Sequence, residues 1–265
     1  MECVVKLYPL IAVMLLSAGA VHAKVPTGDD YLTPNFSAGQ TYGNVFSILR
    51  SVKVDGYDEY AHRNGGSGDY TVVSASPAAW RFDASFRYDG QPVDHGQSEL
   101  RDGGRTDCSV SKNTCEPYLE GSGLTYNPTL WGVPPKQLTQ GMSWKVDLKQ
   151  AWELGGKNGT QTVTVISVDP LTNTATLMRE GTAEGFFSES DAGTIQLSHN
   201  GQIESFDLTP GTSHWKGYTT FVKGIVFNDE LLVIRNDVLR SKNGKTVTAT
   251  ERRIMLLNAA PFPTL

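Results

Sequence analysis

The chain has 265 residues, a formal net charge of −5, 39% hydrophobic and 19% charged residues, 27 Gly and 13 Pro. This composition excludes a collagen-like repeat, a charge-rich disordered tail and a coiled coil. An acidic chain also lacks the basic face that nonspecific nucleic-acid binding requires, so we expect no nucleic-acid partner. The length suits one large domain or two small ones.

The first 23 residues have the features of a cleavable secretory signal. The apolar run Leu7–Val21 follows a short start that contains a lysine, and Val21 and Ala23 stand three and one positions before an expected cut. The alternative is a membrane anchor. Crossing a bilayer takes about 20 uninterrupted apolar residues, however, and Pro9 and Gly19 interrupt this run. We therefore expect export to the periplasm or the medium, and no integral helical membrane protein.

Two cysteines, Cys108 and Cys115, remain after Cys3 leaves with the signal. An even number of cysteines in an exported chain favours a disulfide. Zinc binding is the competing use, but no second Cys or His pair stands nearby at the usual zinc spacing. The loop between the two cysteines is short, so the predicted disulfide is a local cross-link that stabilises the fold by about 2–3 kcal/mol.

Alternation of apolar and polar residues predicts strands along most of the chain. Trp80–Asp89 and Met142–Lys149 are the clearest runs, because every second residue in them is apolar. Three hairpins are predicted in the C-terminal half, around the turn sequences Asp169-Pro170, Asn200-Gly201 and Asn243-Gly244. Strands joined by short turns pair as antiparallel neighbours. The predicted fold class is all-β, with antiparallel sheets from sequential hairpins that form a curved half-barrel or a sandwich.

The chain divides into four predicted parts. These are a signal peptide at 1–23, a linker or N-terminal arm at 24–41, a single β-rich domain at 42–257 and a C-terminal tail at 258–265. Inside the domain, residues 91–141 lose the alternation and hold both cysteines, and three prolines of Gly123–Pro135 oppose regular structure. We expect a long irregular loop there, of the kind that serves as a functional loop or a packed cover.

No motif points to catalysis. The sequence has no nucleophile elbow, phosphate-binding loop, dinucleotide fingerprint, H-E-x-x-H or EF-hand, and Gly65-Gly66-Ser67-Gly68 lacks the elbow spacing. We predict no catalytic residue, no cofactor and no metal site. The candidate ligand-binding residues are Tyr126, Trp131 and Trp152, because such side chains combine a flat apolar body with a hydrogen-bonding group. The alternative is that they belong to the core.

The segment Gly141–Leu257 resembles the periplasmic carriers of lipids and lipoproteins, in which a strongly curved antiparallel sheet wraps an apolar cavity. The resemblance rests on strand order, export and length, and no residue role is carried over with it. It implies a lipid or another envelope component as partner. We expect an exported non-catalytic β-protein that binds an apolar ligand or an envelope partner. The alternatives are an extracytoplasmic hydrolase of a glycan or an ester and an outer-membrane β-barrel.

Overall fold

This computed structural model describes residues 31–76, 79–101, 104–109, 114–117, 124–148, 159–184 and 193–260. These residues form one antiparallel sheet of 14 strands. The strands are β1 (Thr41–Val54), β2 (Tyr60–Ser76), β3 (Ala79–Tyr88), β4 (Asp94–Arg101), β5 (Gly104–Ser109), β6 (Thr114–Pro117), β7 (Ser143–Leu148), β8 (Gly159–Asp169), β9 (Thr174–Ala183), β10 (Thr194–His199), β11 (Gln202–Thr209), β12 (Ser213–Val222), β13 (Ile225–Ser241) and β14 (Thr246–Ala259). A short helix, α2 (Pro128–Trp131), lies between β6 and β7. The prediction of an all-β antiparallel fold is confirmed.

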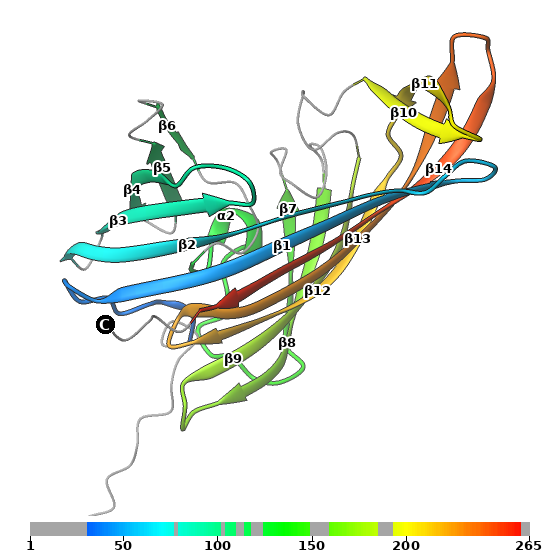
Figure 1. Ribbon diagram of the computed structural model, residues 1–265. Helices are drawn as coiled ribbons and strands as arrows, with labels where there is room; N and C mark the ends of the chain where they lie inside the picture. Colours follow the sequence, from blue (N-terminus) through cyan, green and yellow to red (C-terminus); the bar gives the residue numbers. More distant parts are fainter. Residues whose placement is uncertain are drawn as a thin grey trace, which may run out of the picture.

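The sheet is open and twisted. Its main path runs β6-β5-β4-β3-β2-β1-β14-β13-β12-β9-β8-β7, and the β10–β11 hairpin joins it through β13. Within the described ranges the path has two free ends, β6 and β7, so this is one curved sheet and neither a closed barrel nor two packed sheets. Figure 1 shows β8 and β9 crossing the direction of β1 and β2 at a steep angle, because strand twist accumulates across a sheet.

Three groups of buried side chains lie on the inner side of the sheet. The largest, the α2 core, gathers residues of β7, β8, β9, β12 and β13 around Leu130 and Trp131. The second, the N-terminal core, joins β2, β3 and β4 around Phe36. The third, the distal core, packs β10 and β11 against the far ends of β1, β13 and β14 around Phe206 and Leu239. The burial of apolar side chains therefore stabilises this one sheet at three separate places.

The predicted hairpins are present as β8–β9, β10–β11 and β13–β14. Asn200 and Gly201 have φ of 49° and 76°, the positive values that a two-residue hairpin turn requires. The turn after Asp169 is longer and extends to Asn173, whose φ is 53°. The Asp169 carboxylate accepts a 2.7 Å hydrogen bond from Thr172 Oγ1, which is the main reason why the pKa of Asp169 lies below its ordinary value.

The segment 91–141 is more regular at its start than the sequence indicates, because β4, β5 and β6 lie there. These strands are short and largely polar, so they give no apolar alternation. In the β5–β6 register Cys108 lies directly opposite Cys115. The side chains of both residues are outside the described part of the structure, so the disulfide stays a prediction.

The ends of the domain extend slightly beyond the predicted boundaries. Tyr31 and Leu32 are buried in the α2 core and Phe36 in the N-terminal core, so the last part of the arm packs inside the domain. At the other end β14 continues to Ala259, and residues 261–265 are outside the described part. Among the described residues, no helix has the length and hydropathy needed to cross a bilayer.

Candidate functional site

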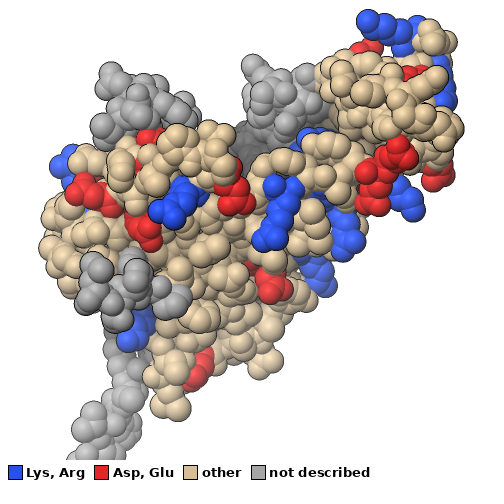
Figure 2. Space-filling model, viewed as in Figure 1, with Lys and Arg blue, Asp and Glu red and all other residues tan. Residues whose placement is uncertain are grey.

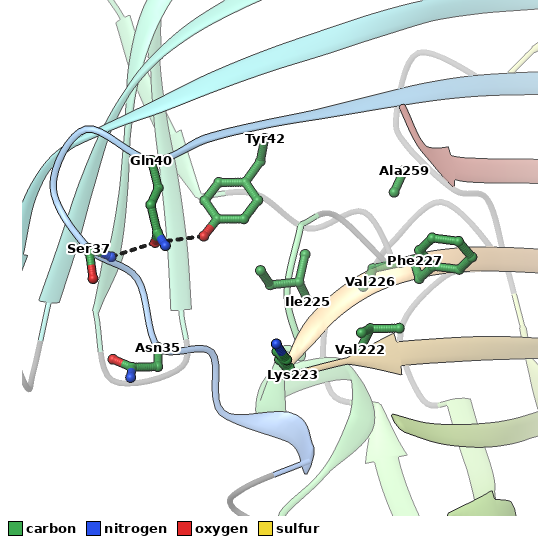
Figure 3. Close-up of a pocket in the computed structure, with 10 residues that line it drawn as sticks. All are labelled: Asn35, Ser37, Gln40, Tyr42, Val222, Lys223, Ile225, Val226, Phe227 and Ala259. Atoms are coloured by element: carbon green, nitrogen blue, oxygen red, sulfur yellow. Dashed lines mark hydrogen bonds between the residues drawn. The ribbon is translucent and has the colours of Figure 1, made fainter. Parts of the chain in front are cut away.

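An open cavity of about 510 Å³ lies where the arm meets the β12–β13 turn and the end of β14 (Figure 3). Ten residues line it: Asn35, Ser37, Gln40, Tyr42, Val222, Lys223, Ile225, Val226, Phe227 and Ala259. These residues come from three segments that are far apart in the sequence. The sheet order brings them together, because β1 and β13 both pair with β14.

The β12–β13 turn forms one wall because its two central residues fix a tight hairpin. Lys223 and Gly224 have φ of 52° and 77°, as a two-residue turn requires. A Cβ added to Gly224 would lie 2.4 Å from the backbone nitrogen of Pro34 and from the carbonyl carbon of Thr33, so the turn sits directly against the arm. The Lys223 N–H also donates a 2.8 Å hydrogen bond to the Asn173 carbonyl. The arm and the turn thus hold each other in place.

The two walls of the cavity differ in chemistry. On the arm side, Gln40 Oε1 accepts hydrogen bonds from the Ser37 N–H at 2.7 Å and from the Tyr42 hydroxyl at 2.8 Å. Burial raises the pKa of Tyr42, so this phenol stays neutral at ordinary pH. Figure 3 shows Ile225 and Phe227 on the opposite side, where the lining is apolar. The cavity offers apolar contacts together with amide and hydroxyl groups and the ammonium of Lys223.

Tyr126 and Trp131, two of the three predicted site residues, are not among the residues that line this cavity. Tyr126 is 7% exposed and Trp131 is fully buried, and both pack against Phe221 in the α2 core. Their rings lie 5.7 Å apart, and neither side chain lines the cavity. Trp152 lies outside the described residues. A ligand-binding role for these three residues stays a prediction, and the burial of Tyr126 and Trp131 favours the core alternative.

Side-chain hydrogen bonds hold α2 against the inner face of the sheet. The Trp131 carbonyl accepts hydrogen bonds from Trp144 Nε1 at 2.7 Å and from the Tyr126 hydroxyl at 3.0 Å. The Leu130 carbonyl accepts one from Gln161 Nε2 at 3.0 Å. Carbonyls at a helix C-terminus lack intrahelical partners, so these bonds satisfy groups that would otherwise be costly to bury. The inner curve of β7–β9 and β12–β13 is therefore filled by α2.

A buried ion pair lies beneath α2. Arg179 Nη2 is 3.0 Å from Asp229 Oδ2, and the side chains are 0% and 6% exposed. Asp229 Oδ1 also accepts a hydrogen bond from the Thr219 hydroxyl. The guanidinium carbon of Arg179 lies 4.7 Å from the centre of the Trp131 ring, which adds a cation–π contact. The ion pair and Thr219 together link β9, β12 and β13 beneath the helix.

A second group of buried charges lies between the α2 core and the distal core. Glu251 accepts hydrogen bonds from Arg50 at 3.0 Å, from Arg235 at 3.1 Å and from Arg253 at 2.6 Å. Arg235 also contacts Asp237 at 2.6 Å. Burial alone would raise the pKa of Glu251, but the guanidinium groups of Arg253 and Arg50 outweigh it and hold this pKa below its ordinary value. Arg50 lies on β1, and the other four residues alternate with exposed ones on β13 and β14, so the sequence shows all of them only as strand residues.

We expect Glu251→Gln to lower the free energy of unfolding at pH 7 by about 1.5–3 kcal/mol, because the amide cannot replace charge-assisted hydrogen bonds to three arginines. A carboxyl with a lowered folded-state pKa stabilises the protein above its unfolded pKa and loses that contribution as pH falls through the folded pKa. The difference between wild type and variant should therefore shrink on acidification below pH 4.5, the ordinary pKa of a glutamate. Urea unfolding at a series of pH values measures this.

Glu204→Gln is the matched control. Glu204 is 35% exposed and lies 3.9 Å from Lys245, so its loss should cost less than about 1 kcal/mol at pH 7. Equal costs for the two variants would contradict the buried-charge account of Glu251.

Among the described residues, no group of three or more His, Cys, Asp or Glu side chains could hold a metal ion. No family model matches the chain, and no curated protein matches it. Two solved structures overlap with most of it. An outer-membrane channel from Pseudomonas putida F1 is 10% identical, with 87% of this chain and 98% of that chain covered and a TM-score of 0.24. A mutant porin of Rh. blastica is 7% identical, with 83% and 100% covered and a TM-score of 0.22. At these TM-scores neither likeness informs the fold or the function of this chain.

Proposed function

We propose that this protein is an exported, non-catalytic β-sheet protein that binds a small amphiphilic ligand in the cavity between the arm and the β12–β13 turn. The cavity itself is the observation that carries the proposal. Its volume of about 510 Å³ suits a small-molecule site, since such sites span roughly 300–1,000 Å³ and combine apolar walls with a few polar groups.

The lining favours a ligand with an apolar body and a polar end. Val222, Ile225 and Phe227 provide apolar contacts, and Phe227 is 56% exposed, so a ligand would remove much of its surface from water. Gln40 and the ammonium of Lys223 are positioned to receive a carboxylate, phosphate or hydroxyl group. A lipid or a lipid-like molecule has this chemistry.

Titration with a fluorescent fatty-acid analogue tests the proposal. The wild-type protein should bind it saturably, and Phe227→Asp should weaken binding about tenfold or more, because a carboxylate replaces an apolar contact surface. Ile203→Asp is the matched control, because Ile203 is 73% exposed on β11 and does not line the cavity. Equal affinities of the two variants, or no saturable binding by the wild type, would refute the proposal. Turnover of an ester-linked probe would instead favour the hydrolase alternative.

We also propose that the protein is exported. Residues 1–23 lie outside the described part of the structure, so the signal peptide stays a prediction from the sequence. Support comes from the apolar run and the small residues before Lys24. Sequencing the N-terminus of protein recovered from its host should give Lys24 first, whereas an intact Met1 on protein from the cytoplasm would contradict export.

We also propose a disulfide between Cys108 and Cys115, since their opposite positions in the β5–β6 ladder suit cross-strand pairing. Changing both residues to Ser should lower the free energy of unfolding by about 2–3 kcal/mol and leave the β-type circular dichroism intact. Thiol titration of the unreduced, denatured protein should find neither cysteine free. Two free thiols, or complete loss of folding in the variant, would contradict this expectation.

A further inference from the structure

The outer face of β1, β14, β13 and β12 is the side opposite the three cores. In the register, Leu49 lies beside Ile254, which lies beside Leu232, and every second residue of each strand shares this face. Six large apolar side chains on it are between 39% and 50% exposed: Val45, Leu49, Tyr218, Ile234, Val238 and Leu256. Apolar residues scattered singly on a surface are ordinary, but here they share one face of four adjacent strands.

The charges on this face are mostly positive. Its exposed charged residues on the four strands are Lys53, Lys216, Arg240, Arg252 and Glu230. Four cations thus accompany one carboxylate, although the whole chain carries a net charge of −5. Lys216 is 3.8 Å from Glu180 of the neighbouring β9, and Arg240 lies opposite Asp207 of β11. Arg252 lies opposite Ser51 of β1 and Ile234 of β13, neither of which is charged. Figure 2 shows Lys and Arg side chains over the middle of the long strands, beside an area without charge.

We propose that this outer face docks onto the surface of an anionic lipid bilayer. The cations would lie near the lipid phosphates, and the apolar side chains would enter the boundary between headgroups and acyl chains. Tyr218 is suited to that boundary, because its ring is apolar and its hydroxyl is polar. The four strands span about 15 Å at their usual spacing. A bilayer surface can contact such a shallow face without a partner of complementary shape. This docking is independent of ligand binding in the cavity.

Sedimentation of the purified protein with vesicles tests the proposal. Vesicles of phosphatidylcholine mixed with phosphatidylglycerol should bind the protein at least tenfold more strongly than vesicles of phosphatidylcholine alone, and added salt should weaken binding. Arg252→Glu should reduce binding at least tenfold, because it replaces an attractive charge by a repulsive one. Lys136→Glu is the matched control, because Lys136 is an exposed cation in the segment between α2 and β7, which is not part of the sheet.

Two further variants distinguish docking by the outer face from lipid entry through the cavity. Leu256→Asn should weaken vesicle binding without a large change in melting temperature, whereas Phe227→Asp, which alters the cavity, should bind vesicles like the wild type. Vesicle binding that Phe227→Asp abolishes would mean that lipid enters through the cavity, and it would overturn the proposal. Equal binding to neutral and anionic vesicles would also overturn it, as would equal effects of Arg252→Glu and Lys136→Glu. A wild-type dimer that Ile234→Asp dissociates would overturn it too, since a second copy would then cover this face.

Discussion

Replacing Trp131 by alanine should lower the free energy of unfolding by about 3–5 kcal/mol. Trp131 is fully buried, its ring lies 5.6 Å from that of Phe221, and the Arg179 guanidinium covers it at 4.7 Å. Removing the indole leaves a cavity between α2 and the sheet that these neighbours cannot fill without moving the helix. Because single domains are stable by about 5–15 kcal/mol in total, the variant should be close to unfolding at elevated temperature.

Chemical denaturation and a probe titration of the same Trp131→Ala protein distinguish its two interpretations. Since Trp131 does not line the cavity between the arm and the β12–β13 turn, each folded molecule should bind the probe as tightly as wild type. Val133→Ala, at a residue that is 84% exposed, should cost less than about 0.5 kcal/mol and serves as the control. Weaker binding at unchanged stability would show that Trp131 contacts the ligand, and the core interpretation would be wrong.

Asp229→Ala should destabilise the protein by about 3–5 kcal/mol, because it removes the carboxylate that faces a fully buried arginine. The Thr219 hydroxyl loses its acceptor in the same change. Urea unfolding measures the loss. Glu230→Ala alters the next residue along β13, which is exposed on the outer face, and should cost less than about 0.5 kcal/mol.

A double variant tests whether the cost comes from the charge left behind. Adding Arg179→Met to Asp229→Leu removes both charges and keeps the volume apolar, so the double variant should be more stable than Asp229→Leu alone. If the double variant is the less stable of the two, the charge left on Arg179 is not the source of the cost and our account of it is incorrect.

The hairpins can be predicted because their information is local. Asn200-Gly201 has the positive φ values that its residue types favour, and the flanking alternation sets the register. The sequence does not predict β2, because the centre of this strand contains Gly65 and Gly66, which are poor strand residues. The structure shows the reason for Gly66. A Cβ there would lie 2.2 Å from the Arg87 carbonyl oxygen and 2.7 Å from the Phe46 ring, so the glycine makes room for a neighbouring strand and an aromatic side chain.

The cavity cannot be predicted from sequence patterns, since it depends on how distant segments meet. Gln40, Ile225 and Ala259 approach each other through the β1–β14 and β13–β14 ladders and through the contact of the arm with Gly224. The one local signal is Lys223-Gly224 between two alternating runs, which resembles a hairpin turn. Choosing candidate residues by their aromatic side chains selects Tyr126 and Trp131 instead. The sequence around such a residue looks the same whether the side chain packs in a core or contacts a ligand.

The place of β14 in the sheet has a consequence for how the protein folds. In the strand order β14 stands between β1 and β13, so it joins the half made of β1–β6 to the half made of β7–β13. Its pairing with β1 brings Asn44 opposite Ala259 across almost the whole sequence. Contacts of such long sequence separation slow folding, because a large loop must close before they form. The two halves can therefore gain local structure early, but the continuous sheet must wait until the ribosome has completed its last strand.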